Sequence, residues 1–288
     1  MKNNALYGKL ALFIAAFLWG ISFVAVEKAM DFGWSPFVLL GMRGLLSGLA
    51  LSVFAIKNKF WKKRHLMLES VFAGFLMFIG MALQTYGQQY STVSNSSFIT
   101  VLYVVFIPVI LWKKQRATNS VLLAIFFAVI GTAFLTLNGG LTLKVGDILL
   151  IGCAWLFAVH IIFLNHVIRH NDVMSVAMIQ SFTMSALGFI FASFNGQGIP
   201  STGWIYVLYA GLVSSGLAFF LQLYGQQRVS PTISGLLLTL ESLFGSLGAI
   251  FLLNEPFTIN VLVGGSLMLL AVVTIELGPR LFLQIKGG

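Results

Sequence analysis

Apolar residues come along this chain in runs of about 20, the length at which a helix crosses the roughly 30 Å hydrocarbon layer of a bilayer. Charged residues, Gly and Pro fall between the runs. The pattern therefore predicts an all-α integral membrane protein with ten transmembrane helices. Their expected ranges are 9–26, 36–56, 67–87, 95–112, 121–138, 147–165, 173–194, 203–224, 232–253 and 259–277.

Composition favours the same fold class. Of the 288 residues, 58% are hydrophobic and only 9% are charged, whereas a soluble domain carries roughly a quarter charged residues. The connections between the runs are short, so we expect no inserted soluble domain. Lys2 and Lys9 precede the first run, but no A-x-A cleavage pattern follows it. We therefore interpret this run as a membrane helix and not as a removed signal peptide.

The net charge of +9 is distributed unevenly between the two predicted sides of the membrane. Lys28 and Lys144 fall in loops on one side, Arg43 lies inside the second helix, and the other Lys and Arg residues fall on the side of the termini. Because basic residues in short loops stay on the cytoplasmic side, we expect a multi-pass protein of the cell inner (plasma) membrane with both termini cytoplasmic. The basic run at 57–65 is interpreted as a topology anchor, with lipid binding as the alternative. No nucleic-acid partner is indicated.

The chain contains an internal repeat. The heptapeptide LQTYGQQ at 83–89 recurs as LQLYGQQ at 221–227, an offset of 138, and Trp19 and Trp155, in the first helix of each half, are related by an offset of 136. We predict two repeats of five helices: residues 1–140 hold helices one to five, and residues 141–288 hold helices six to ten. Because five is odd, the second repeat enters the membrane from the opposite side, giving the inverted-repeat architecture of many secondary transporters.

Three longer segments carry a resemblance to a known family. They are LWGISFVAVEKAM (18–30), ALQTYGQQYSTVSNSSFITVLYVVFIPVI (82–110) and RVSPTISGLLLTLESLFGSLGAIFLLNEPFT (228–258). In order and spacing they resemble the EamA family of ten-helix exporters and permeases, within the drug/metabolite transporter superfamily. Two positions depart from that pattern. Ser242 follows Glu241 where the family usually has a helix-kinking proline, and Gln115 stands where the family often repeats the acidic residue seen here at Glu255.

The resemblance and the inverted repeats imply transport. We expect a secondary active transporter that exports amino acids or related amphipathic metabolites by alternating access. Its expected partners are a small-molecule substrate, a proton as candidate coupling ion, and membrane lipid; the oligomeric state is left open, a monomer included. The pathway is expected to close outside near Glu27, Ser94 and Glu255, and inside at the Gln-Gln segment around Arg228. A passive metabolite channel or facilitator and a lipid scramblase are the alternatives.

Enzymatic activity is not expected. The sequence has no phosphate-binding loop and no clustered nucleophile and base. His166 and His170 lie four residues apart, but no third metal ligand is close in sequence. With one cysteine, Cys153, the chain cannot form an intrachain disulfide. We therefore predict no metal site and no cofactor.

Two ionisable residues within the apolar runs are candidates for the transport pathway, because a charge at bilayer depth is costly unless it faces a cavity or a partner. Glu241 lies near the middle of the ninth helix and is a candidate carboxylate for proton or amine binding. Arg43 lies in the second helix and is a candidate anchor for a substrate carboxylate. Both could instead be structural groups that pair with each other or with neighbouring polar atoms.

Further pathway candidates lie on helices one, three, four, six and eight, which the family resemblance places with helix nine around the cavity. Gln84 and Gln222 occupy matching places in the repeat and could bind substrate or join helices. Aromatic side chains could line an apolar pocket or could simply pack. These aromatic candidates are Trp19, Tyr103, Trp155 and Tyr224.

Overall fold

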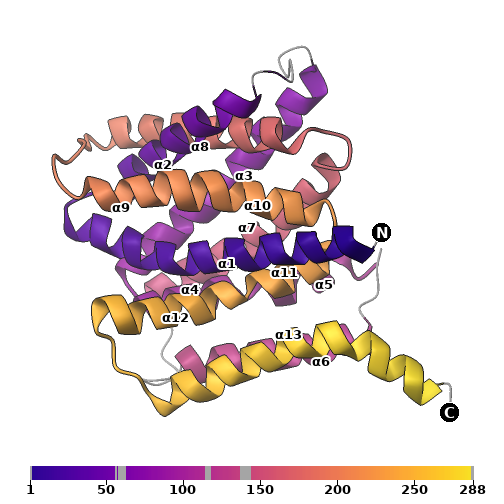
Figure 1. Cartoon of the computed structure of the whole chain (residues 1–288). Coiled ribbons are helices and arrows are strands. Elements are labelled where there is room, and N and C mark those ends of the chain that lie inside the picture. Colours follow the sequence, from indigo (N-terminus) through magenta and orange to yellow (C-terminus); the bar gives the residue numbers. More distant parts are fainter. Residues whose placement is uncertain (1, 56, 58–62, 114–117, 137–143, 287–288) are drawn as a thin grey trace.

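The structure, a computed structural model, describes residues 2–55, 57, 63–113, 118–136 and 144–286. These residues form helices that lie side by side, with both ends of the chain at the same end of the bundle (Figure 1). The elements are α1 (Lys2–Asp31), α2 (Pro36–Ala55), α3 (Arg64–Gln89), α4 (Val93–Thr100), α5 (Tyr103–Leu111), α6 (Asn119–Thr136), α7 (Val145–Val167), α8 (Val173–Phe194), α9 (Trp204–Leu208), the π-helix η3 (Tyr209–Leu217), α10 (Ala218–Gln226), α11 (Pro231–Leu238), α12 (Leu240–Leu253) and α13 (Ile259–Lys286).

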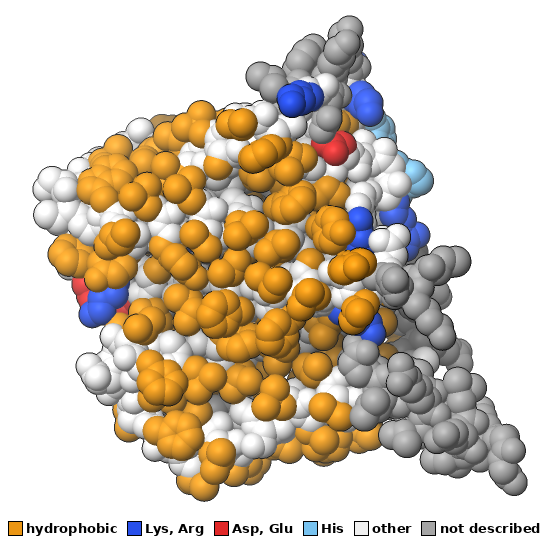
Figure 2. All heavy atoms as spheres, in the orientation of Figure 1, with side chains coloured by type: hydrophobic (Ala, Val, Ile, Leu, Met, Phe, Trp, Pro, Cys, Tyr) orange, Lys and Arg blue, Asp and Glu red, His pale blue; other side chains and the backbone are white. Residues whose placement is uncertain are grey.

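The outer surface is that of a protein surrounded by lipid. Within the described residues, eight helical stretches are long and apolar enough to cross a membrane, and two shorter apolar helices, at 119–131 and 259–274, complete the ten predicted spans. Figure 2 shows apolar side chains across most of the visible face, with most Lys and Arg side chains toward the right edge and a smaller charged group at the left edge. Phe194 and Phe251 are 83% and 77% exposed, which an aqueous surface would disfavour. The predicted fold class is therefore confirmed.

The ends of several helices differ from the prediction. α1 covers residues 2–31 instead of 9–26, and α13 continues to Lys286 instead of 277. The prediction followed the apolar runs, whereas a helix continues into polar sequence because its hydrogen bonds are internal. Most of the predicted anchor at 57–65, and Gln115, lie outside the described residues.

The fourth and ninth spans, each predicted as one helix, are both interrupted. The fourth is divided at Val101 and Leu102, and the ninth at Thr239, the repeat equivalent of Val101. The second interruption needs no proline: the Thr239 hydroxyl donates to the Leu236 carbonyl at 2.7 Å, and the Ser242 hydroxyl donates to the Thr239 carbonyl at 2.8 Å. Such bonds from Ser and Thr to the preceding turn bend helices. Helices broken at corresponding places in two repeats often mark a central site.

Close glycine contacts show that the two halves are related by a pseudo-two-fold axis. Gly87 of α3 lies against Gly146 of α7, and their repeat equivalents, Gly225 of α10 and Gly8 of α1, lie against each other in the same way. A Cβ added at Gly87 would lie 3.0 Å from the Gly146 carbonyl oxygen, and one at Gly225 would lie 2.8 Å from that of Gly8. The halves therefore interleave: α1 packs with α10, α3 packs with α7, and α2 packs with α8 across the axis.

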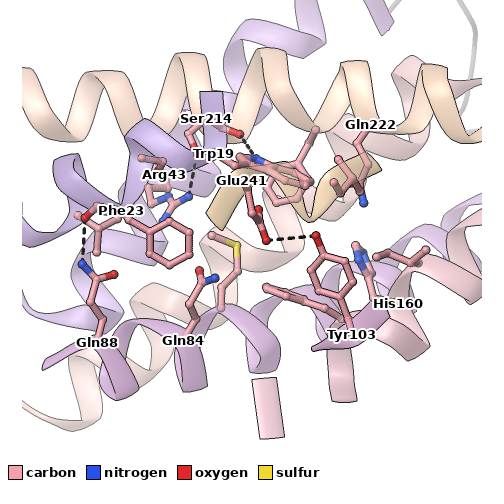
Figure 3. Close-up of a pocket in the computed structure, with 17 residues that line it drawn as sticks. Trp19, Phe23, Arg43, Gln84, Gln88, Tyr103, His160, Ser214, Gln222 and Glu241 are labelled. Carbon is pink, nitrogen blue, oxygen red and sulfur yellow. Dashed lines mark hydrogen bonds between the residues drawn. The ribbon is translucent and has the colours of Figure 1, made fainter. Parts of the chain in front are cut away.

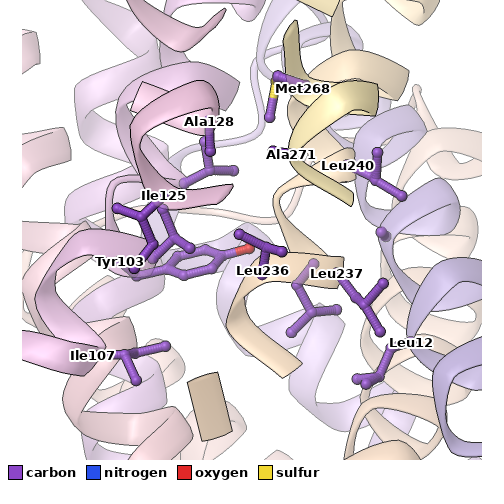
Figure 4. Packing of buried hydrophobic residues seen from close by; sticks show 14 of the residues in the cluster. Leu12, Tyr103, Ile107, Ile125, Ala128, Leu236, Leu237, Leu240, Met268 and Ala271 are labelled. Atoms are coloured by element: carbon purple, nitrogen blue, oxygen red, sulfur yellow. The ribbon is translucent and has the colours of Figure 1, made fainter. Parts of the chain in front are cut away.

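The largest apolar cluster fixes both interrupted spans. It joins α5, α11 and α12 to α6 and α13, with Leu236 and Leu237 of α11 close to side chains of the two outer helices (Figure 4). Tyr103, at the start of α5, and Leu240, at the start of α12, both belong to this cluster. Apolar packing thus holds the helix starts that follow the two interruptions.

Candidate functional site

A cavity lies at the centre of the interleaved helices. The empty space between its walls, solvent at its mouth included, is about 590 Å³. Its wall is drawn from α1, α2, α3, α5, α7, η3, α10, α11 and α12 (Figure 3). The lining residues are Trp19, Ser22, Phe23, Val26, Arg43, Met81, Gln84, Gln88, Tyr103, Phe157, His160, Ile161, Ser214, Phe219, Gln222, Leu238 and Glu241.

Most lining positions come in pairs that the repeat relates. In each pair the two residues are related by the offset of 138, one from each half of the chain, and both line the cavity. The pairs are Trp19 with Phe157, Ser22 with His160, Phe23 with Ile161, Met81 with Phe219, Gln84 with Gln222, and Tyr103 with Glu241. The cavity therefore lies on the pseudo-two-fold axis.

Glu241 and Tyr103 are equivalent in the repeat and meet near this axis. The Tyr103 hydroxyl donates to Glu241 Oε1 at 3.2 Å (Figure 3). Glu241 follows the interruption at Thr239 directly and is 4% exposed. Among the described side chains, the ion pairs join Lys28 with Asp31 and His65 with Glu69, and none reaches Glu241. Its carboxyl group therefore has a neutral hydroxyl as partner and no cation among the described side chains.

Arg43 is likewise held by neutral groups. It is 3% exposed; its Nε donates to Ser215 Oγ at 3.1 Å, and its Nη2 donates to Ser214 Oγ at 3.2 Å. Both serines belong to η3, and π-helical turns are frequent at functional sites. Neither Arg43 nor Glu241 forms an ion pair with the other. Of the two structural alternatives, pairing with each other is not what the structure has, whereas pairing with neighbouring polar atoms agrees with these contacts.

Side chains from α1 and α2 hold η3 in place. Trp19 Nε1 donates to the Ser214 carbonyl at 2.9 Å, and Ser47 Oγ donates to the Ser215 carbonyl at 2.8 Å. The Tyr209 hydroxyl of η3 donates in turn to the Leu18 carbonyl at 3.0 Å. These bonds satisfy backbone groups of a segment that is not an ordinary α-helix, so the serines beside Arg43 have a fixed position.

The structure places most of the predicted pathway residues in the cavity wall, namely Trp19, Arg43, Gln84, Tyr103, Gln222 and Glu241. Trp155 and Tyr224 lie outside the lining. Trp155 is 46% exposed and packs edge-on against Phe106, with ring centroids 5.3 Å apart. The Tyr224 ring lies 3.4 Å from the guanidinium carbon of Arg228. These two residues are therefore not part of the candidate site.

Several lining positions were not predicted from the sequence, among them Ser22, Met81, Phe157 and Phe219. The offset of 138 in the repeated heptapeptide finds one of them, because it matches Phe157 with the candidate Trp19. Met81 and Phe219 match each other, and neither is a candidate from the sequence. Trp155 is related to Trp19 by an offset of 136, two residues less than the offset of 138 between the heptapeptides. Two residues turn a helix by about 200°, so that side chain points away from the cavity.

The two ends of the bundle differ in charge. The end that holds both termini is called the basic face, because Lys9, Arg64, Arg169 and Arg228 lie at or near the helix ends there (Figure 1). The other end is called the opposite face. The Ser94 hydroxyl donates to the Glu255 carboxylate at that face, where the sequence predicts a closure.

An amide hydrogen bond crosses each end of the cavity, between the pair α1–α10 and the pair α3–α7. Toward the opposite face, Gln88 Nε2 of α3 donates to the Phe23 carbonyl at 2.9 Å and to the Glu27 carboxylate of α1 at 3.1 Å. Toward the basic face, Asn165 Nδ2 of α7 donates to the Gln226 carbonyl of α10 at 2.9 Å. We call these bonds the opposite-face latch and the basic-face latch.

The latches are related by the repeat, since Glu27 matches Asn165 and Gln88 matches Gln226. The cavity nevertheless extends further toward the opposite face. Val26 and Gln88 line it there, whereas their equivalents Leu164 and Gln226 do not and are 0% and 1% exposed. The cavity is therefore more tightly closed toward the basic face than toward the opposite face.

Metal-binding residues are not clustered in the described part of the chain. No group of three His, Cys, Asp or Glu residues could hold a metal ion there. His166 and His170 lie with ring centroids 6.1 Å apart. What the cavity offers to a ligand is a set of aromatic, amide and hydroxyl side chains, one guanidinium, one imidazole and one carboxyl group.

Comparisons with known proteins agree along almost the whole chain. The model of a family described as the EamA-like transporter family matches twice, at residues 6–137 and 144–277. An uncharacterized transporter of Archaeoglobus fulgidus is 30% identical over 94% of this chain and 86% of its own length. The uncharacterized transporter YoaV of Bacillus subtilis is 20% identical over 90% of this chain and 93% of its own.

A solved structure agrees in fold. It is described only as the crystal structure of a protein, and it superposes with a TM-score of 0.79 over 96% of this chain and 98% of its own, at 15% identity. At this identity the likeness shows the fold alone.

Proposed function

We propose a transport mechanism from one premise: the chain belongs to the EamA-like transporter family. On that premise the protein is a secondary active transporter of small organic metabolites, amino acids or related amphipathic compounds, and it works as an exporter. The central cavity is its substrate site, with the residues Trp19, Arg43, Gln84, Tyr103, Gln222 and Glu241. The observation that carries the proposal is that six repeat-related pairs of residues line one central cavity.

The packing suggests which groups of helices separate during transport, namely the pair α1–α10 and the pair α3–α7, each called a body. The contacts α1–α10 and α3–α7 bring glycine backbones together, whereas the latches that join these pairs are a few side-chain hydrogen bonds at the cavity ends. In our proposal the latches between the two pairs open, because they are weaker than the glycine contacts within each pair. Each moving body then contains helices of both repeats, 1–140 and 141–288, and the two latches open in turn.

The proposal also assigns orientation. The basic face is cytoplasmic in the inner membrane, because Lys and Arg in short loops stay on that side. The structure then represents a state closed toward the cytoplasm, and the opposite-face latch is the outer closure. A proton, bound in exchange for substrate, is the proposed coupling ion.

A ligand screen combined with counterflow tests the proposed function. Purified protein is heated with single metabolites, and a compound that binds the native state should raise the melting temperature by mass action. Vesicles loaded with an unlabelled hit should then take up the labelled hit faster than empty vesicles. Binding with flux but no counterflow stimulation would identify a passive channel, and flip of fluorescent lipids without metabolite flux would identify a scramblase.

Breaking one latch should open one end of the cavity. In a Cys153→Ala background, the lining position Ser22→Cys reports access of a membrane-impermeant thiol reagent. Asn165→Ala should raise its labelling from the cytoplasmic side, and Gln88→Ala should raise it from the outer side. A net hydrogen bond of about 0.5–1.5 kcal/mol corresponds to roughly 2- to 10-fold.

The matched control for this experiment is Asn171→Ala. Asn171 Nδ2 donates to Glu69 at 2.9 Å, so it joins the turn after α7 to α3 within one proposed body near the same face. Its loss should leave labelling from either side unchanged. Equal effects of Asn165→Ala and Asn171→Ala would contradict the assignment of the latches, and labelling of wild type mainly from the cytoplasmic side would reverse the proposed state.

A further inference from the structure

We propose that Arg43 and η3 form an anion-binding site at one end of the cavity, here called the pole. This pole selects substrates that carry a carboxylate. The inference rests on the proposed function and narrows it: the substrate class becomes small amphipathic carboxylic acids, with their apolar part against the aromatic wall. Three features of the cavity carry the inference, namely the lack of a counter-charge, the restriction to one side of the axis, and the fixed geometry of the guanidinium.

The guanidinium lacks a counter-charge. Arg43 is buried, and its protein partners are the hydroxyls of Ser214 and Ser215. No carboxylate of the described residues forms an ion pair with it, and Nη1 has no acceptor among them. A buried cation without an anion is costly inside a membrane. A ligand carboxylate would supply both the missing charge and acceptors for the free donors, in the planar arrangement that Arg matches well.

The pole is restricted to one side of the axis. The repeat equivalent of Arg43 is Ser181, whose hydroxyl lies 2.8 Å from that of Ser47 and does not line the cavity. In Figure 3, Arg43 lies on the side of Phe23 and Gln88, whereas Gln222 and His160 lie on the other side of Glu241. A ligand carboxylate at Arg43 therefore sits toward the opposite face, and its apolar part extends along the axis.

The remaining wall suits an apolar body. The repeat-related pairs contribute the rings of Trp19, Phe157 and Phe219, with Phe23 and Met81 beside them. Trp19 and Phe219 contact each other edge to face, with centroids 5.1 Å apart. Aromatic walls with few polar groups are typical of sites that orient a ligand by one anchored group.

The guanidinium is fixed before any ligand binds. Arg43 Nε donates to Ser215 Oγ and Nη2 donates to Ser214 Oγ. The carbonyls of Ser214 and Ser215 in turn accept from Trp19 and Ser47. The segment that positions Arg43 thus belongs to the π-helix, which has no counterpart in the continuous α3 of the first repeat. We assign Ser214 and Ser215 as positioning residues for this pole.

The test uses pairs of probes that differ in the carboxylate alone: L-phenylalanine with L-phenylalaninamide, L-leucine with L-leucinamide, and indole-3-acetate with indole-3-acetamide. Binding to wild-type protein is measured by thermal shift and by competition with the counterflow substrate. At least one carboxylate should bind, and it should bind about 10- to 100-fold more tightly than its amide, as expected for charge-assisted hydrogen bonds. Arg43→Gln should abolish that preference without creating a preference for the amide.

Further variants separate recognition from folding. Arg43→Lys keeps the charge but loses the planar fork, so it should bind the carboxylate more weakly and still prefer it over the amide; this variant also decides the matter if Arg43→Gln does not fold. Ser215→Ala should weaken carboxylate binding only. The proposal is wrong if no carboxylate probe binds, if the amides bind equally well, or if Arg43→Gln retains the preference. Counterflow of a neutral or cationic substrate would still support transport in each of these cases.

Discussion

The Glu241→Gln variant is expected to lose proton-driven accumulation of substrate while it retains substrate exchange. Glu241 lines the cavity, is 4% exposed and has no cationic partner among the described residues, so a proton or a bound cation must neutralise it in some step of the cycle. Glutamine keeps the size of the side chain but cannot take up and release a proton. The carboxyl of Glu241 is therefore the group that we expect to couple protons to substrate.

The measurement uses proteoliposomes with an interior one pH unit more acidic than the medium. Efflux of one proton per substrate can support up to about tenfold accumulation inside, because one unit of pH corresponds to about 1.36 kcal/mol. Wild-type vesicles should approach that ratio, and Glu241→Gln vesicles should reach a ratio near unity. Counterflow without a pH gradient should persist in the variant.

Two further variants make this result specific. Glu69→Gln changes a carboxylate that pairs with His65 outside the cavity and should accumulate substrate like wild type. Tyr103→Phe removes the hydroxyl that donates to Glu241 but leaves the carboxyl, so proton-driven accumulation should persist. Undiminished accumulation by Glu241→Gln would remove this residue from proton coupling, and equal losses in all three variants would indicate a general effect on folding.

The fold could be predicted because its main signals can be read from the sequence of each segment on its own. A run of apolar residues long enough to cross a bilayer is visible without any knowledge of packing, and one repeated heptapeptide fixes the offset between the halves. The same offset, applied to every candidate, also predicts which side chains face the axis. It matches Phe157 with Trp19, and both line the cavity.

Other features of the site could not be predicted, because they depend on contacts between distant segments. The π-helix at 209–217 forms where Trp19 and Ser47 donate to its carbonyls, and nothing in the local sequence of that segment requires a π turn. The interruption at Thr239 arises from hydroxyl bonds to the preceding turn, whereas the sequence suggested only that a kinking proline is missing. Local departures from regular helix geometry therefore depend on the assembled structure.

Backbone contact between α2 and α8 leads to the second large effect, a loss of stability in Gly44→Ala. A Cβ at Gly44 of α2 would lie 2.5 Å from the carbonyl oxygen of Ser181 and 2.5 Å from the amide nitrogen of Ser185, both in α8. These are backbone atoms, so no side-chain rotation relieves the overlap and the helices must move apart. We expect a loss of about 1–3 kcal/mol from overpacking, although alanine is the better helix former by roughly 1 kcal/mol.

The only cysteine, Cys153, makes the measurement direct. Its side chain is 0% exposed, so a thiol-reactive dye reports unfolding during heating in detergent. Gly44→Ala should unfold at a clearly lower temperature than wild type. Gly48→Ala should cost less, since its Cβ would meet only the ring of Phe182 at 2.8 Å, and Gly216→Ala should be neutral, since its nearest atom is 3.5 Å away.

The order of these three variants tests how α2 and α8 meet across the pseudo-two-fold axis. Backbone contact at Gly44 leaves no room for compensation, whereas the ring beside Gly48 can shift, and the space beside Gly216 accepts a methyl group. If all three variants melted together, α2 and α8 would be further apart than the structure has them. The hydroxyl pair of Ser47 and Ser181 would then separate as well, and the position of Arg43 beside η3 would lose one of its supports.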